Sequence, residues 1–126
     1  MESSANSQSP VLLLVEDEVL IRYPAAEYFR DHEFRVLEAG NAREALIYLQ
    51  TRSMHINVMI SDVKMPGDMD GIQLADWTRD HCPHVRILLV SGWSGRTIAD
   101  HGHELIEKPY VFDQLLAKVR KALARE

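Results

Sequence analysis

The segment VLLLVED, residues 11–17, decides the fold class of this 126-residue chain. Five consecutive apolar residues, Val11 to Val15, are typical of a strand that is covered on both faces, as in a parallel sheet. Two acids, Glu16 and Asp17, follow the apolar run directly. The segment therefore predicts a buried parallel strand that brings two carboxylates to one edge of a sheet.

Short apolar runs alternate with longer amphipathic stretches along the rest of the chain. Further strands are predicted at residues 34–39, 56–61, 85–91 and 103–107. Helices are predicted at residues 18–31, after the cap Asn41, at 70–81, near 95–101 and over 110–126. Strands that alternate with helices predict parallel pairing through right-handed crossovers. We expect an α/β fold: a doubly wound, flavodoxin-like, five-stranded parallel sheet in the order 2-1-3-4-5 with five helices.

Two details of the helices bear on their orientation. Val19 and Val111 are predicted to lie on the inward faces of the first and last helices. Pro24 removes one backbone hydrogen bond wherever it lies inside a helix. Either the first helix bends there, or it starts later with Pro24 in its first turn.

Composition narrows the classes of function. The net charge is -5, with 46% hydrophobic and 26% charged residues, so no basic footprint for nucleic acid is present. The single cysteine, Cys82, excludes a disulfide framework and favours a reducing cytoplasm. No stretch approaches the ~20 apolar residues of a membrane span. Residues 1–10 are polar, lack the apolar core of a secretory signal, and are expected to form a disordered lead.

Residues at the carboxyl ends of the strands are the candidates for chemistry, since ligands of open parallel sheets bind there. They are Glu16, Asp17, Asp62, Ser91, Gly92, Lys108 and Pro109. Clustered carboxylates are costly unless a cation joins them, and a few oxygen ligands suit Mg²⁺. A lysine and a hydroxyl beside the metal suit a phosphoryl group. We therefore predict a Mg²⁺-dependent phosphoryl site with a carboxylate acceptor, and we expect the end of the second strand to lie away from it.

The segment ISDVKMPGDMDG, residues 60–71, contains three aspartates with different predicted roles. Asp62 ends the third strand and is the candidate nucleophile. Asp68 lies in a glycine-flanked loop and is expected to be a turn residue. Asp70 is predicted to cap the third helix.

Four motifs, VLLLVEDE, ISDVKMP…MDG, LLVSG and EKP, resemble the receiver domains of two-component response regulators over residues 11 to about 124. The resemblance implies a receiver domain at 11–126 in which Asp62 accepts a phosphoryl group from a phosphohistidine. The donor would be a histidine kinase or a histidine phosphotransfer protein. Asp17 would be a direct Mg²⁺ ligand, Glu16 would act directly or through water, and the backbone carbonyl of Lys64 would supply a further ligand.

The resemblance also implies roles at the last two strands. Ser91 would turn to bond a phosphoryl oxygen, and Gly92 would keep the approach open. Lys108 would pair with the acceptor and then with the phosphoryl group, and a cis peptide bond would precede Pro109.

The chain departs from the family pattern at several positions. Leu105 replaces the aromatic residue that usually lies three positions before the lysine, so the usual switch is missing or altered. We hypothesise that Trp93, two residues after Ser91, reports or transmits phosphorylation; a packed or exposed loop tryptophan is the alternative. The loop after Asp62 is one residue longer than usual, and Glu33 stands where many members have glycine.

Several readings of function remain open. The first is a single-domain, cytoplasmic signalling regulator, not an enzyme, that contacts a downstream protein through the helix near 95–101, the last strand and the last helix. Direct contact with nucleic acid or membrane insertion is not expected. The alternatives are a receiver excised from a hybrid histidine kinase or larger regulator, and a non-phosphorylated docking module. A flavodoxin-like nucleotide binder is disfavoured because two acids follow the first strand, and a phosphohydrolase because Lys64 occupies the place of its general acid.

Overall fold

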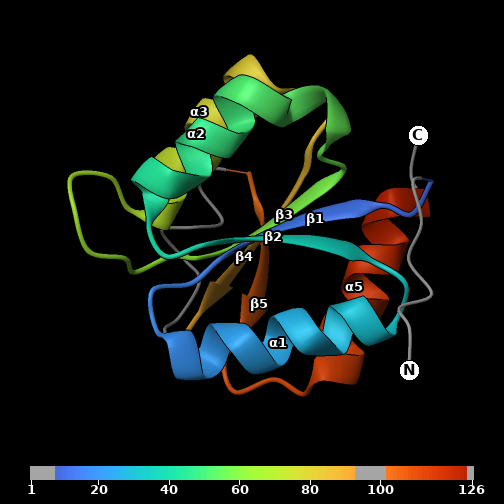
Figure 1. The fold of residues 1–126 in the computed structure, drawn as a ribbon. Coiled ribbons are helices and arrows are strands. Elements are labelled where there is room, and N and C mark those ends of the chain that lie inside the picture. The colour runs from blue at the N-terminus through green and yellow to red at the C-terminus, as the bar shows by residue number, and fades with distance from the viewer. Residues whose placement is uncertain (1–7, 93–101, 125–126) are drawn as a thin grey trace.

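The computed structural model describes residues 8–92 and 102–124, in which strands and helices alternate around one sheet (Figure 1). The elements are β1 (Val11–Val15), α1 (Val19–Asp31), β2 (Arg35–Ala39), α2 (Ala42–Arg52), the 3₁₀ turn η1 (Ser53–His55), β3 (Val58–Asp62), α3 (Gly71–His81), β4 (Arg86–Ser91), β5 (Glu104–Glu107) and α5 (Phe112–Ala124). All strand pairs are parallel, in the order β2-β1-β3-β4-β5. The predicted fold class and strand order are confirmed. The described residues hold four α-helices, and the fifth, expected near 95–101, falls outside them.

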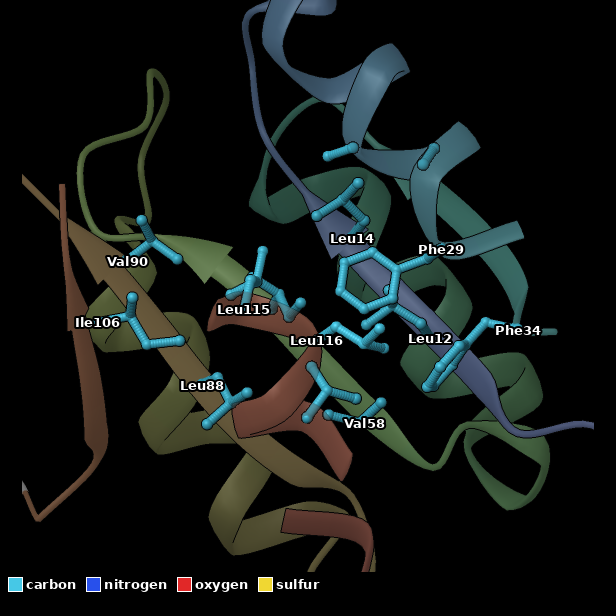
Figure 2. Close-up of a cluster of buried hydrophobic side chains, with 14 residues drawn as sticks. Leu12, Leu14, Phe29, Phe34, Val58, Leu88, Val90, Ile106, Leu115 and Leu116 are labelled. Carbon is cyan, nitrogen blue, oxygen red and sulfur yellow. The ribbon is translucent and has the colours of Figure 1, made fainter. Parts of the chain in front are cut away.

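Strand β1 lies inside the sheet and is buried along its whole length. Leu12 and Leu14 pack against α1 and α5 on one face, while Leu13 and Val15 pack against α2 and α3 on the other. Figure 2 shows the first of these clusters, in which Phe29 of α1 lies beside the β1 leucines. Burial of each such side chain stabilises the folded state by roughly 1.5–3 kcal/mol, so a shift in the register of β1 would lose several of these contributions. The end of β1 is therefore held at a defined point of the sheet edge.

The structure settles one open alternative and corrects two of the sequence predictions. Strand β1 ends at Val15, directly before the two acids, and Pro24 lies inside α1, so the helix does not start later with Pro24 in its first turn. Val19 is the first residue of α1 and is 54% exposed, so the inward face of this helix does not include its first residue. Val111 is 61% exposed because it precedes α5 instead of belonging to it.

No helix of the described residues has the length and apolarity needed to cross a bilayer.

Helix α1 ends in a turn with one residue in the left-handed region. Glu33 has φ 72°, its N–H donates to Arg30 O at 3.2 Å, and the N–H of Phe34 donates to Phe29 O at 3.1 Å. The two phenylalanine rings then meet edge to face, with 5.3 Å between their centroids. This pattern is a Schellman motif with its apolar contact, and glycine is the residue that such a position favours.

The change Glu33→Gly is expected to stabilise the protein by about 1 kcal/mol, because a β-carbon in the left-handed region costs roughly 1–2 kcal/mol and the greater freedom of unfolded glycine offsets part of the gain. Urea unfolding measures the effect. Glu33→Ala is the control, since it removes the charge and keeps the β-carbon. A gain of equal size in Glu33→Ala would show that backbone strain is not the cause.

Candidate functional site

The candidate site lies at the edge of the sheet where the strands end. Val15 of β1 is paired with Ser61 of β3, and Asp62 of β3 is paired with Val90 of β4. The residue after Val15, Glu16, therefore emerges beside Asp62. The predicted meeting of strand ends at one edge is confirmed.

Three carboxylates gather at this edge. Glu16, Asp17 and Asp62 each offer an oxygen that lies within 4.8 Å of the other two. Glu16 is only 6% exposed, whereas Asp17 is exposed and Asp62 is intermediate. The backbone N–H of Glu18 donates to Glu16 Oε2 at 3.0 Å. Burial, together with the charge of Asp62, raises the pKa of Glu16 to about 7, although the bond from Glu18 opposes the shift.

A lysine contacts the same cluster. Lys108 Nζ donates to Asp62 Oδ2 at 2.7 Å, and both side chains are partly buried. Burial lowers the pKa of Lys108, but its hydrogen bond to Asp62 and the charges of Asp62 and Glu16 outweigh that effect, so the pKa is raised. Lys108 is therefore a cation that opposes the charge of the acids at this edge.

The other predicted site residues surround the same hollow. Its lining residues are Asp17, Glu18, Asp62, Lys64, Ser91, Gly92 and Lys108. Ser91 is buried, and its carbonyl accepts from Lys108 N at 2.7 Å, so β4 holds the lysine backbone in place. The N–H of Lys64 faces Asp62 Oδ1 at the long distance of 3.4 Å. The peptide bond between Lys108 and Pro109 is cis, which confirms that expectation.

One predicted switch residue, Leu105, does not line this hollow. Leu105 lies on β5, paired with Leu89 and partly buried against it. Its side chain lines a second shallow hollow between β5 and α5. Trp93 lies outside the described residues, so its proposed switching role stays a prediction.

The loop after β3 brings α3 against the backbone of the candidate nucleophile. Asp70 forms a reciprocal capping box with Gln73, which confirms its predicted role as a cap. The N–H of Gly71 donates to Val63 O at 2.8 Å. A β-carbon on Gly71 would lie 2.0 Å from the carbonyl oxygen of Asp62, so only glycine fits there. Sequence analysis missed this contact.

A second missed residue is Arg22 of α1. Its Nη1 donates to the carbonyl oxygen of Glu16 at 2.9 Å, and its Nε donates to Glu38 Oε1 of β2 at 3.1 Å. The end of β2 lies away from Asp62, on the outer side of β1 as expected, but Arg22 links Glu38 to the backbone of Glu16. The strand order alone carried no signal for this link.

The acidic cluster fits a hard divalent cation. It offers only oxygen ligands, two of its carboxylates are accessible from the hollow, and all three lie close enough to share one ion. The raised pKa of Glu16 arises mainly from its burial and also from the charge of Asp62, so a cation bound here would offset the cost of its charged form. Mg²⁺ is a suitable occupant because it accepts a few carboxylates and keeps several waters.

Comparison with known proteins agrees with this geometry. The sequence model described as the response regulator receiver domain matches residues 12–120. The sensor kinase CckA of Brucella abortus is 30% identical over 125 residues, which cover 95% of this chain and 13% of that protein. The chain spans only 13–39% of the length of the first curated relatives it matches.

Solved structures give the same result. The receiver domain of the hybrid histidine kinase CckA is 33% identical with a TM-score of 0.78, covering 90% of this chain and 98% of that one. The response regulator protein TrrA from Thermotoga maritima, in complex with Mg²⁺-BeF, is 28% identical with a TM-score of 0.80. That match covers 90% of this chain and 99% of TrrA.

Proposed function

The chain belongs to the response regulator receiver family, and on that premise we propose that Asp62 accepts a phosphoryl group from a phosphohistidine of a histidine kinase or histidine phosphotransfer protein. One observation carries the proposal: the Asp62 carboxylate lies at the end of β3 with Lys108 Nζ at 2.7 Å and the acids Glu16 and Asp17 beside it. A carboxylate between a cation and a metal-binding acid pair is arranged to receive a dianionic group.

The proposed transfer involves one bond formed and one broken. An Asp62 carboxylate oxygen attacks the phosphorus, and the bond from phosphorus to the imidazole nitrogen of the donor breaks. The electron pair returns to that nitrogen, which takes a proton from solvent. Lys108 then pairs with a phosphoryl oxygen, and the Ser91 hydroxyl donates to another.

Mg²⁺ would be held by Asp17, Asp62 and the Lys64 carbonyl, with Glu16 bound directly or through water, and it would supply charge neutralisation for the incoming phosphoryl group. The TrrA complex with Mg²⁺-BeF supports this assignment by similarity. We propose that the chain is a signalling domain with its own phosphoryl chemistry and not an enzyme acting on a separate substrate.

Phosphorylation would shift a two-state equilibrium in the face that includes β5 and α5, and a downstream protein would bind that face. Leu105, Lys118 and Lys121 line a hollow between these elements, which supports a protein contact there. We propose a cytoplasmic regulator without contact to nucleic acid. The chain would be either a single-domain regulator or a receiver module of a longer kinase or regulator.

The test is phosphoryl uptake from acetyl phosphate. With Mg²⁺ we expect one phosphoryl group per chain by intact mass spectrometry, and excess EDTA is expected to prevent the uptake because the acids then repel the donor. Restoring Mg²⁺ in excess over EDTA is the control for chelator damage. Equal uptake with and without the metal would overturn the proposal, and so would a linkage that resists hydroxylamine, which cleaves acyl phosphates.

A further inference from the structure

Glu16 is held at three points, two on its backbone and one on its side chain. Its N–H donates to Ala39 O at 3.0 Å, and its Oε2 accepts from Glu18 N at 3.0 Å. Its carbonyl oxygen lies beyond the last paired residue of β1, Val15, so no neighbouring strand supplies a ladder partner. The donor to this oxygen is Arg22 Nη1 at 2.9 Å. A guanidinium from α1 thus holds the peptide that joins the two acids Glu16 and Asp17.

Arg22 is itself fixed by an ion pair. Its Nε lies 3.1 Å from Glu38 Oε1, with side-chain exposures of 18% and 24%. The other oxygen, Glu38 Oε2, lies 3.1 Å from Arg30 Nη2. Glu38 therefore forms ion pairs with two arginines of α1. Arg22 also donates to the carbonyl oxygen of Glu16, whereas Arg30 also donates to Val36 O and to Glu27.

We propose that Arg22 is a positioning residue for the metal site: it fixes the peptide between Glu16 and Asp17 so that both carboxylates face one cation. This inference rests on the proposed function, because it assumes that the acids bind Mg²⁺. Mg²⁺ demands nearly ideal octahedral geometry, so a small tilt of this peptide weakens its binding. Without Arg22, the carbonyl oxygen of the buried Glu16 would lack a hydrogen-bond donor. The peptide would rotate to find another partner, and the carboxylates of Glu16 and Asp17 would move with it.

The direction of the change in Mg²⁺ affinity distinguishes a positioning role of Arg22 from an effect of its charge. Arg22 carries a positive charge near the site, so its removal would tighten Mg²⁺ binding if its Coulomb repulsion of the cation alone acted. Loss of the hydrogen bond to Glu16 would weaken binding instead. The two explanations predict opposite changes in the same measured dissociation constant.

The experiment compares Arg22→Met with Arg30→Met. Both variants remove one α1 guanidinium and one ion pair to Glu38, and only the first removes the bond to Glu16. Calorimetric titration of the metal-free protein with Mg²⁺ is expected to show about 10-fold weaker binding in Arg22→Met, as for outer partners of metal ligands. Arg30→Met is expected to stay within about twofold of wild type, since the bonds of this guanidinium go to Glu27, Glu38 and Val36 O.

A second readout needs no metal. Hydrogen exchange of the Glu16 amide, which bonds Ala39 O, is expected to be faster in Arg22→Met and unchanged in Arg30→Met. Arg22→Lys keeps the charge and one donor, so an intermediate Mg²⁺ affinity is expected, and this variant tests the inference if Arg22→Met does not fold. Binding in Arg22→Met that equals or exceeds wild type overturns the inference alone. Failure of the wild type to bind Mg²⁺ overturns the proposed function.

Discussion

Replacing Asp62 with asparagine is expected to abolish phosphoryl uptake from acetyl phosphate, with a loss of at least about 100-fold in rate, because the amide has no anionic oxygen to attack phosphorus. The size of the side chain is nearly unchanged, so the fold is expected to persist. Intact mass spectrometry over a time course, with Mg²⁺ in excess, measures the rate. Lys108 would lose its anionic partner at 2.7 Å in the same variant.

Asp68→Asn is the matched control for this experiment. Asp68 is an exposed residue of the following loop and lines a separate hollow beside α2. The same change from acid to amide there is expected to leave the rate within about twofold, since an exposed charge outside the site is screened. Uptake that persists in Asp62→Asn, or that is lost equally in Asp68→Asn, would show that another residue is the acceptor.

The meeting of the acids with Lys108 was predictable from the sequence because it depends on topology. An apolar run that ends in an acid predicts a buried strand and its end, and alternation with helices predicts parallel strands. Parallel strands carry their carboxyl ends to one edge, so Glu16, Asp62 and Lys108 had to come near one another. The contacts at this edge of the sheet agree with that topology.

Side-chain contacts that cross between elements were not predictable in the same way. The bond from Arg22 to Glu16 depends on the angle of α1 and on one arginine rotamer, and neither leaves a pattern in the sequence. The exposed Val19 and Val111 show the same limit, since an apolar residue at a helix start can face solvent as easily as the core. Helical periodicity indicates which residues share a face, but it does not specify where that face begins.

Replacing Gly71 with alanine is expected to destabilise the protein by about 3 kcal/mol, a large value for the addition of one methyl group. The added β-carbon would lie 2.0 Å from Asp62 O and 2.8 Å from Val63 Cα. Both contacts are with backbone, so no side chain can move aside to relieve them. Either α3 shifts away and loses the bond from Gly71 N to Val63 O, or the end of β3 shifts and displaces the nucleophile.

Urea unfolding measures the loss of stability, and phosphoryl uptake in the folded variant measures the displacement of Asp62. Under conditions where Gly71→Ala is folded, we expect uptake about tenfold slower than wild type, because small misplacements of a reacting group are costly. Gly92→Ala is the control for stability: it also lies at the site, and its β-carbon would meet no atom of residues 8–92 and 102–124 within 4 Å. Equal stability of the two variants would mean that α3 and the end of β3 can separate freely. In that case Gly71 would not set the position of Asp62, and the loop of residues 63–70 would have to hold it alone.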